Sequence, residues 1–310
     1  MNTRIIRKFA SFTPSKMSNL HHRMPTTFGP FPGPRQSFDG RARDGSGISN
    51  VEAFITFKAQ QSDLASLLPP TFSFQKPGLE AYVSITAKRL DNLEWLAGRG
   101  YNLLSVYIHG VQYTTEEGGR VYRGTYLPVL WEDMADPIIS GREELGFPKL
   151  YADLNISQTE STYSMIASWD GSKFAELSLR GLHTEENQDG MGSRRLLAPP
   201  EAGVDEGILL WRYMPSTGHP GQADVDYPVF VSHAEEEKKQ QARVIKRLVA
   251  GEGEFKWHPL DWQALPTLHH IVARLERIHT LDIVACGLVE KVGGGDLSSA
   301  RRVGSEQPSL

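Results

Sequence analysis

Hydrophobic residues recur at every second position through much of this chain, in short runs that glycine, proline and aspartate separate. Such alternation is typical of β-strands that turn one face to a core. The runs rich in β-branched and aromatic residues predict strands at 54–57, 81–88, 103–114, 120–130, 150–156, 163–169, 174–182, 208–214, 226–232 and 281–290. Two tight connections, Glu117-Gly118-Gly119 and Asp170-Gly171, predict hairpins between consecutive strands.

Helical spacing is convincing in one segment. Apolar residues at 268, 271, 272, 275 and 278 follow Pro266 and predict a helix over 266–278. The whole pattern predicts a mainly β (α+β) protein with a few helices and an antiparallel sheet system, closed or packed as a sandwich. The stretch from His183 to Gly207 is too long for an ordinary turn, so we expect either a mobile lid or a disordered loop.

The two ends of the chain differ from its centre in composition. Residues 1–38 contain no acidic residue and several arginines, lysines and prolines, which predicts either a disordered extension or a mitochondrial transit peptide. The glycine run at 293–295 and the polar residues after it predict a disordered tail over 293–310. Residues 39–292 then form a single domain. We expect a cytoplasmic location, or a mitochondrial one if the basic end is a transit peptide.

Composition excludes several classes of function. The chain has 310 residues, 39% hydrophobic and 23% charged, which suits a globular protein with a sizeable core. No apolar run approaches the roughly 18 residues needed to cross a bilayer, so no membrane span is expected. The net charge is −4 and the basic residues are scattered, which argues against nucleic-acid binding. The ten histidines lack zinc-ligand spacing, and we expect no metal.

The segment 141–149, Gly-Arg-Glu-Glu-Leu-Gly-Phe-Pro-Lys, carries the candidate chemistry. Gly146 permits a bend, and Pro148 fixes its own φ and holds Phe147 extended, so Lys149 leaves a stiff backbone. A lysine amine is a nucleophile only when neutral, and its ordinary pKa is roughly 10.4. Burial among apolar neighbours would lower that pKa. The alternative is an exposed lysine in a turn, because lysines are seldom buried.

Strand alternation places Lys149 on the polar side of the strand that follows it. Along 150–156 the even positions are apolar and the odd positions are polar. An amine that faces water would be protonated and inert. Nucleophilic chemistry therefore requires that the polar side of this strand face an enclosed cavity or a neighbouring subunit.

The run 141–150 resembles the active-site motif of the acetoacetate decarboxylase family, whose lysine forms a Schiff base with a β-keto acid and is an established example of an activated amine. The resemblance extends over roughly 27–292 and is specific at Lys149. It implies an antiparallel, barrel-like or cone-like fold, a small keto acid as substrate and a homo-oligomer. No cofactor is implied, because the lysine itself accepts the electrons.

Departures from the family motif leave the supporting residues open. The family's second lysine is replaced here by Leu150, so a lowered pKa at Lys149 would rest on burial. Rough alignment places Ser84 where the family has a strand glutamate. The second family glutamate falls in the loop 90–101, near Arg99 and Gly100, and Glu94 lies close by in sequence.

Four residues are therefore candidates to support Lys149. Arg142 and Glu143 lie in the same segment, 141–149, although a neighbouring arginine and glutamate more often form a structural ion pair. Glu94 is a candidate carboxylate, and Arg99 is a candidate for binding the carboxylate of the substrate.

Three functions remain open on these residues. The first is a carbon-carbon lyase that decarboxylates a β-keto acid through a Schiff base at Lys149. The second is an aldolase-dehydratase or retro-aldol lyase that acts on a larger keto acid, as in secondary metabolism, because an iminium serves these reactions equally well. The third is a non-catalytic barrel that binds a small ligand.

Overall fold

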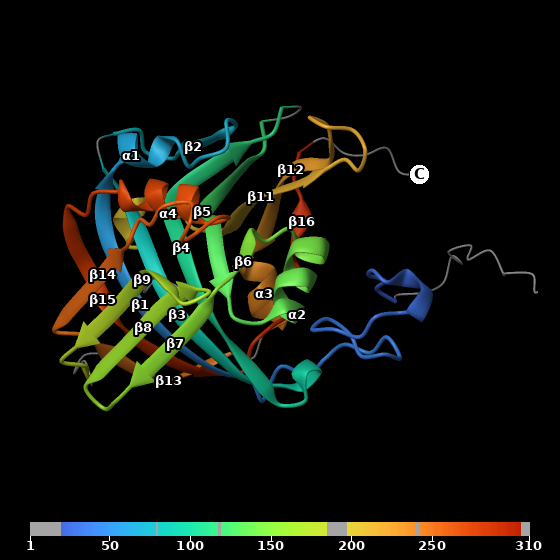
Figure 1. The fold of residues 1–310 in the computed structure, drawn as a ribbon, viewed down its shortest axis with the longest axis horizontal. Helices are drawn as coiled ribbons and strands as arrows, with labels where there is room; N and C mark the ends of the chain where they lie inside the picture. Colours follow the sequence, from blue (N-terminus) through green and yellow to red (C-terminus); the bar gives the residue numbers. More distant parts are fainter. Residues whose placement is uncertain (1–19, 79, 117–118, 185–196, 240–241, 305–310) are drawn as a thin grey trace, which may run out of the picture.

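The computed structural model describes residues 20–78, 80–116, 119–184, 197–239 and 242–304. Strands dominate this part of the chain and form two sheets (Figure 1). The large sheet has 12 strands in the order β10-β13-β15-β1-β3-β4-β5-β11-β12-β16, with β2 paired to β4 and β6 paired to β5. The small sheet has four strands in the order β14-β9-β8-β7.

The strands of the large sheet are β1 (Ser49–Gln60), β2 (Phe72–Phe74), β3 (Glu80–Leu93), β4 (Arg99–Thr114), β5 (Val121–Glu132), β6 (Lys149–Tyr151), β10 (His183–Thr184), β11 (Gly207–Pro215), β12 (Ala223–Ser232), β13 (Arg243–Val249), β15 (Asp282–Val292) and β16 (Arg301–Arg302). Those of the small sheet are β7 (Asp153–Gln158), β8 (Thr162–Trp169), β9 (Ser172–Arg180) and β14 (Glu252–Trp257).

Helices are short and lie between the strands. The α-helices are α1 (Gln61–Ala65), α2 (Ala135–Ser140), α3 (His233–Lys239) and α4 (His269–Glu276). Three 3₁₀ turns are η1 (Thr26–Phe28), η2 (Glu94–Leu96) and η4 (Pro200–Ala202), and η3 (Gly141–Leu145) is a π-helical turn that continues α2.

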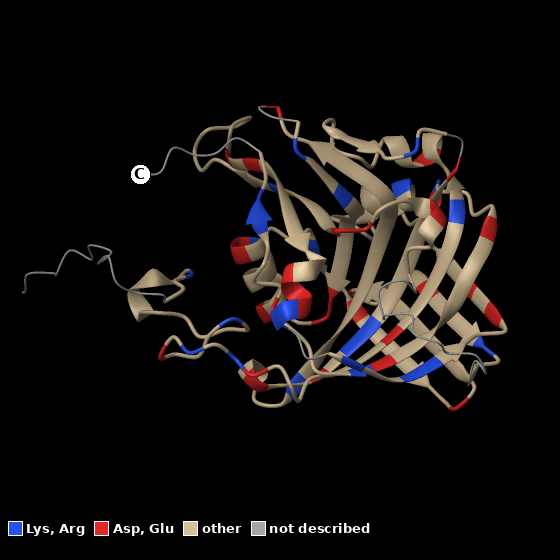
Figure 2. Ribbon diagram, turned by 180° about the vertical axis from the view of Figure 1, so that it is seen from behind, with Lys and Arg blue, Asp and Glu red and all other residues tan. Residues whose placement is uncertain are grey.

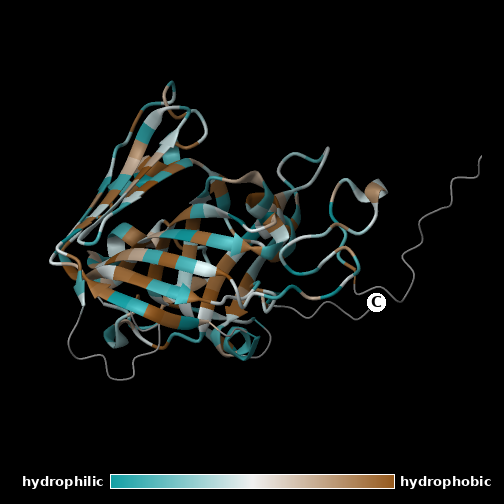
Figure 3. Ribbon diagram, turned by 90° about the horizontal axis from the view of Figure 1, so that it is seen from below, coloured by the Kyte–Doolittle hydropathy of each residue, from teal (hydrophilic) through white to brown (hydrophobic). Residues whose placement is uncertain are grey.

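The main core lies where α4 and the small sheet pack against one face of the large sheet. Every second residue of the strands points into it, and hydrophobic and hydrophilic bands accordingly alternate along them (Figure 3). The large sheet contributes Ile55, Ile85, Leu104, Val106 and Trp131, the small sheet contributes Met165 and Leu177, and α4 contributes Val272 and Leu275.

The opposite face of β1, β3, β4, β5 and β6 carries charged and hydroxyl side chains beside a second hydrophobic cluster that includes Leu103, Leu130 and Phe147, and we call it the polar face. Register fixes its members: Glu52 pairs with Lys88, Lys88 with Leu103, and Leu103 with Glu132. The next row toward the other end of β3 runs from Thr86 through Ser105 and Leu130 to Lys149. Strand register therefore brings charged residues from distant parts of the chain onto one surface of the sheet.

The structure confirms the mainly β class and most predicted elements. Strands β4 and β5 pair antiparallel across the predicted 117–119 connection, of which residues 117–118 lie outside the described residues. Strands β8 and β9 are joined at Asp170 and Gly171, whose φ angles of 47° and 78° are those of a two-residue hairpin turn. Helix α4 lies within the predicted range 266–278 and buries Val272 and Leu275.

Closure into a barrel or cone is not confirmed, because the sheets remain open. The large sheet ends at the two-residue strands β10 and β16, and the small sheet is separate. The predicted strand at 150–156 is in fact two strands. The chain leaves the large sheet after Tyr151 and enters the small sheet at Asp153, while the buried Ala152 between them donates its backbone N–H to the Glu132 carbonyl at 3.1 Å.

Both ends of the described chain are packed more closely than the predicted extension and tail. Residues 20–38 bury Arg23, Arg35 and Gln36, and residues 293–304 bury Val303 and add β16 to the edge of β12. A local window could not show this, since the stabilising partners are distant in sequence. Residues 1–19, 185–196 and 305–310 lie outside the described residues, and 185–196 belong to the predicted lid or loop.

No helix in the described ranges is both long enough and apolar enough to span a membrane.

Candidate active site

Lys149 is held by a compact connection that leads from β5 through α2 and η3 to β6. Strand β6 runs parallel to β5, with Lys149 opposite Leu130. Gly146 ends η3 with a φ of 78°, a left-handed conformation that glycine adopts without strain. The Phe147 N–H then donates to the Gly141 carbonyl at 3.1 Å, and the Leu130 N–H donates to the Pro148 carbonyl at 3.2 Å. The stiff backbone expected from the Gly-Phe-Pro turn is thus tied to β5 on one side and to η3 on the other.

The amine of Lys149 lies in a nearly closed environment. Its side chain is 11% exposed, and Nζ lies 2.8 Å from Oε1 of Glu132, a carboxylate that is fully buried. Nζ also donates a hydrogen bond to the Pro137 carbonyl at 3.0 Å. The Lys149–Glu132 contact is an ion pair by distance but not an aligned hydrogen bond, since neither Glu132 oxygen accepts one from a described residue. Glu132 therefore keeps acceptor capacity beside the amine.

Gly141 provides the space for the lysine side chain. A Cβ placed on Gly141 would lie 2.6 Å from Cδ and 2.7 Å from Nζ of Lys149, which is closer than real Cβ contacts allow. Glycine at this position is therefore a requirement of the site and not only of the turn.

The pKa values of the two partners shift toward each other. Burial lowers the pKa of Lys149; the Glu132 charge opposes this shift and the charge of Arg35 adds to it. Burial raises the pKa of Glu132, and Lys149 opposes that shift. Both directions favour a neutral amine beside a protonated carboxyl group, since burial penalises both charged forms.

Arg35 is a second cation at the site and comes from the amino-terminal segment. Its guanidinium contacts Glu144 of η3 through Nε, and its Nη1 donates to the Asp296 carbonyl at 3.4 Å. Its Nη2 is buried and has no hydrogen-bond partner among the described residues. The charge of Arg35 influences the pKa values of Lys149 and of Tyr101, whose pKa burial strongly raises. A buried guanidinium with a free N–H near the amine is suited to an anionic ligand.

Of the two candidates next to Lys149 in the motif, Arg142 contacts it. Nη1 of Arg142 donates to the backbone carbonyl of Lys149 at 2.9 Å and so braces the start of β6. The backbone carbonyl of Glu143 accepts a hydrogen bond from Arg212. Arg142 therefore supports the lysine through the backbone, and no described contact joins the Glu143 side chain to the amine.

The other two candidates lie at the end of the β3–β4 hairpin, with contacts of their own. Glu94 forms an exposed ion pair with Arg43 at 3.0 Å. Nη1 of Arg99 donates to the Leu96 carbonyl at 3.3 Å within the same turn. Among the described residues, neither Glu94 nor Arg99 contacts Lys149, because Glu94 binds Arg43 and the Asp44 N–H while Arg99 binds the Leu96 carbonyl.

Sequence reasoning missed Glu132 and Arg35. The predicted strand ended at Leu130, whereas β5 continues through Trp131 to Glu132. The available signal was the carboxylate pair Glu132-Asp133 directly after an apolar run, since a strand that continued by two residues would bury Glu132. No comparable signal identified Arg35, which reaches the site only through the docking of residues 20–38.

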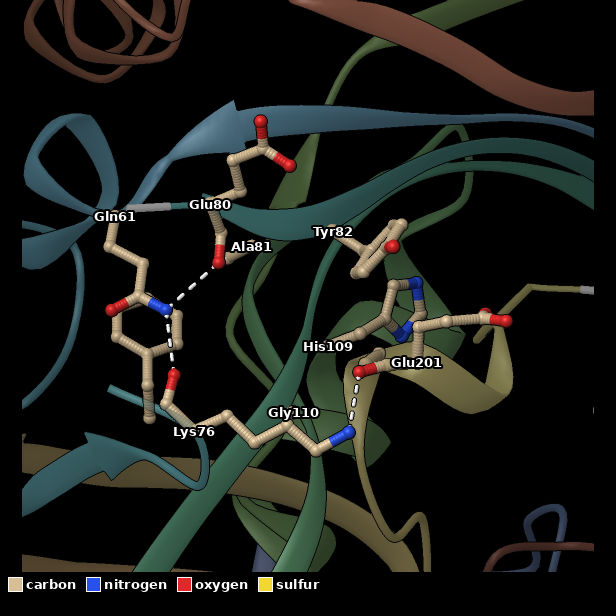
Figure 4. Close-up of a pocket in the computed structure, with 10 residues that line it drawn as sticks. Gln61, Lys76, Glu80, Ala81, Tyr82, His109, Gly110 and Glu201 are labelled. Carbon is tan, nitrogen blue, oxygen red and sulfur yellow. Dashed lines mark hydrogen bonds between the residues drawn. The ribbon is translucent and has the colours of Figure 1, made fainter. Parts of the chain in front are cut away.

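A separate cavity of about 80 Å³ lies near one end of β3 and β4, and neither Lys149 nor Glu132 lines it. Figure 4 shows its lining residues. His109 lines it together with Lys76, Tyr82 and Glu201. Nε2 of His109 lies 2.6 Å from the hydroxyl of Ser84. Burial lowers the pKa of His109 to about 4, so this ring is neutral near pH 7.

No set of three or more His, Cys, Asp or Glu side chains in the described ranges is arranged to hold a metal ion.

Comparisons with known proteins relate this arrangement to one family. The family model for acetoacetate decarboxylase (ADC) matches residues 23–280. A search of the curated proteins found no match.

Solved structures share the fold at low sequence identity. Acetoacetate decarboxylase from Legionella pneumophila has a TM-score of 0.57 and 16% identity, with 93% of this chain and 97% of that chain covered. An acetoacetate decarboxylase-like enzyme from Sphingomonas wittichii RW1 has a TM-score of 0.52 and 17% identity, with 84% and 94% covered. The enduracididine biosynthesis enzyme MppR has a TM-score of 0.55 and 11% identity, with 83% and 86% covered.

Proposed function

The chain belongs to the acetoacetate decarboxylase family, and we propose that it is a Schiff-base-forming lyase that decarboxylates a β-keto acid through Lys149. The family and its related folds support a lyase-type enzyme. The observation that carries the finer proposal is the buried pair of Lys149 and Glu132 at 2.8 Å, whose pKa values shift in opposite directions.

The proposed reaction begins with the neutral amine of Lys149. Its nitrogen attacks the ketone carbon of the substrate to form a carbinolamine, and the protonated carboxyl group of Glu132 donates a proton to the departing hydroxyl group as water leaves. The product is a protonated imine on Lys149. Because the amine and the acid are adjacent, no additional base is required for this step.

Carbon dioxide departs from the iminium. The electrons of the carbon–carboxylate bond move toward the positively charged nitrogen and leave an enamine. Glu132, which gave up its proton as water left, takes up another from solvent and protonates the enamine carbon, which regenerates an iminium. Water hydrolyses it and releases the ketone, so that one β-keto acid yields one ketone and one carbon dioxide.

Arg35 contributes in two ways to this proposal. Its charge disfavours the ammonium form of Lys149, which is the effect of the second lysine in the family motif, where this chain has Leu150. Its unpartnered Nη2 can hold the carboxylate of the substrate near the amine. The site thus combines a nucleophile, an acid and an anion-binding group.

Reductive trapping tests the proposal. The protein is incubated with acetoacetate and borohydride, and modified lysines are mapped by mass spectrometry. We expect a stable adduct at Lys149, none at Lys149 in the Lys149→Arg variant, and an unchanged adduct in the control Lys173→Arg, which alters an exposed lysine paired with Glu176. Release of carbon dioxide should depend on Lys149 in the same way. An active Lys149→Arg variant would exclude this nucleophile.

A second candidate is an aldolase-dehydratase or retro-aldol lyase that acts on a larger keto acid. It is favoured by the fold shared with MppR, one structure of which is a complex with the condensation product of pyruvate and imidazole 4-carboxaldehyde, at a TM-score of 0.53 and 12% identity. Trapping with pyruvate, and product formation from pyruvate and an aldehyde without release of carbon dioxide, would favour this candidate. No adduct with any keto acid would favour a binding protein.

A further inference from the structure

A second cluster of charges lies on the polar face and has no role in the proposed reaction. Glu52 of β1 is 5% exposed and lies between two lysines. Its Oε1 is 3.0 Å from Nζ of Lys88 on β3, and its Oε2 is 3.4 Å from Nζ of Lys291 on β15. Strands of the large sheet carry charged residues of both signs side by side (Figure 2). Two ammonium groups thus share one carboxylate.

The charge states in this cluster are the opposite of those at Lys149. Burial by itself would raise the pKa of Glu52, but Lys88 and Lys291 lower it to about 2. Burial by itself would lower the pKa of Lys88. The charge of Glu52 outweighs this effect, so the pKa of Lys88 is raised. Lys88 is therefore an ammonium at neutral pH. The same face carries one lysine whose environment favours the neutral form and another whose environment favours the cation.

Strand register places the two lysine sites close together. Glu132, Leu103, Lys88 and Glu52 are direct neighbours across β5, β4, β3 and β1. The backbones of Glu132 and Lys88 are two strand spacings apart, which is about 10 Å. Leu103 alone separates them in this row. Leu103 is partly buried and packs against the second hydrophobic cluster. A short carbon chain along the exposed part of Leu103 would span the distance from the Lys149–Glu132 pair to the lysine cluster.

The cluster also has binding capacity to spare. An ammonium has three N–H donors, and Glu52 is the acceptor found for Lys88 within the described ranges. The Lys88 side chain is 22% exposed, so a ligand can reach it. The hydroxyl of Thr86, which is 1% exposed and lies on the same face, has no hydrogen-bond partner among the described residues. Unsatisfied buried hydroxyl groups are uncommon, and a bound ligand would satisfy this one.

We propose that Lys88 and Lys291, positioned by Glu52, form a second anion-binding site that takes the distal carboxylate of a keto diacid whose ketone reaches Lys149. Glu52 prevents the two ammonium groups from repelling each other, and Leu103 packs against the aliphatic middle of the ligand. The inference rests on the proposed function for the ketone end, while the anion site itself depends only on the cluster.

Two substrates of different length test the proposal. Acetoacetate and 3-oxoadipate both present a 3-keto acid, but only 3-oxoadipate carries a second carboxylate. We expect half-maximal borohydride trapping at Lys149 at a lower concentration of 3-oxoadipate. The Lys88→Met variant should weaken trapping of 3-oxoadipate at least about tenfold, the scale of one charge-assisted hydrogen bond, and leave acetoacetate unchanged.

Two further variants separate charge from structure. Lys88→Arg keeps the cation and should retain most of the preference for 3-oxoadipate. Lys58→Met is the control, because the Lys58–Glu80 pair joins the same two strands at 3.2 Å but lies far along them from Glu52. It should change the trapping of neither substrate. An equal loss for both substrates in Lys88→Met would assign the cluster a structural role and overturn the proposal.

Adipate makes the outcome independent of Schiff-base chemistry, because it has two carboxylates and no ketone. We expect calorimetry to detect adipate binding to the unmodified protein and weaker binding to Lys88→Met. Adipate binding without any trapped ketone would reject the proposed function and keep the anion site. If half-maximal trapping needs the same concentration of both keto acids and adipate does not bind, the anion site is rejected and the proposed function is kept.

Discussion

At the scale of single residues, the pairing of Lys149 with Glu132 decides what the site can do. Transfer of two charges from water into a buried site is costly, and a single close contact offsets that cost only when the geometry is good. Here the contact is close at 2.8 Å, but the carboxylate oxygens accept no aligned hydrogen bond from the described residues. Burial therefore shifts both groups toward their neutral forms, which together are a nucleophile and an acid.

Replacement of Glu132 by Gln should separate these two roles. Glu132 raises the pKa of Lys149 against the effect of burial, so Glu132→Gln should lower that pKa and move the acid limb of the pH profile for borohydride trapping to lower pH. Turnover should fall about a hundredfold or more, because the acid is lost. Glu143→Gln alters a neighbouring carboxylate and serves as the control. Unchanged turnover in Glu132→Gln would show that another group supplies the proton.

Replacement of Arg35 should shift the same profile in the opposite direction. The charge of Arg35 lowers the pKa of Lys149, so Arg35→Gln should raise that pKa and move the acid limb to higher pH. The KM for acetoacetate should also rise, whereas reductive trapping of acetone, which has no carboxylate, should be affected only through the pH profile.

Arg23→Gln is the matched control for Arg35. Arg23 is similarly buried and lies 3.0 Å from the same carboxylate, Glu144, but its Nη2 already donates to the Pro32 carbonyl. If both variants change KM and the pH profile equally, Arg35 acts only as an anchor for the amino-terminal segment.

At the scale of elements, the connection from β5 to β6 positions the nucleophile. The helix α2 continues into the π-helical turn η3, a type of distortion that often marks functional sites. Its glycines are used differently, since Gly146 allows a left-handed turn and Gly141 leaves room for the lysine. The sequence predicted the bend at Gly146 because it depends on neighbouring residues. It could not predict the packing role of Gly141, which depends on the path of Lys149.

A methyl group at Gly141 should therefore disable the site without unfolding the protein. In Gly141→Ala the new Cβ would meet the side chain of Lys149 and displace its amine from Glu132. We expect little or no trapping at Lys149, with thermal unfolding within a few degrees of the unmodified protein. Gly251→Ala, where a Cβ would have nearest contacts of 3.7 Å and 3.8 Å, is the control. Normal trapping in Gly141→Ala would mean that the turn can shift to make space.

At the scale of the whole molecule, two open sheets enclose polar groups that couple stability to pH. The neutral His109 ring contacts the hydroxyls of Ser84 and Thr125 inside the fold. Glu52 is held as a carboxylate by two lysines. Both groups bind protons less readily in the folded state than in the unfolded state, so acid should destabilise the protein through each of them.

The pH dependence of unfolding should reveal His109 first. The folded pKa of about 4 lies below the ordinary value of 6.5, so the stabilisation is present above pH 6.5 and is lost as pH falls toward 4. The free energy of unfolding should drop by about 3 kcal/mol over this range. Glu52 should add a further loss as pH falls from 4.5 toward 2.

Urea titrations at pH 7, 5.5 and 4 measure this effect. The His109→Gln variant should be less stable than the unmodified protein at pH 7 but should lose less stability on acidification. His219→Gln alters an exposed histidine and should follow the unmodified protein. Parallel pH profiles for His109→Gln and the unmodified protein would show that this ring is not the titrating group.

The sequence by itself determined many of the strands, the main helix, both hairpins and the bend before Lys149, because each depends on residues that are neighbours in the chain. It predicted neither β13 nor β14 and joined β6 to β7. The homo-oligomer and the cellular location stay predictions. Tertiary structure decided what surrounds Lys149. Glu132 reaches the amine through the parallel pairing of β5 with β6, and docking of residues 20–38 brings the charge of Arg35 within range of it. Register across β3, β4 and β5 places Lys88 in the same row as Glu132. Tertiary structure also left the sheets open, because strand pairing between distant segments is set by packing of the whole chain and not by any local pattern.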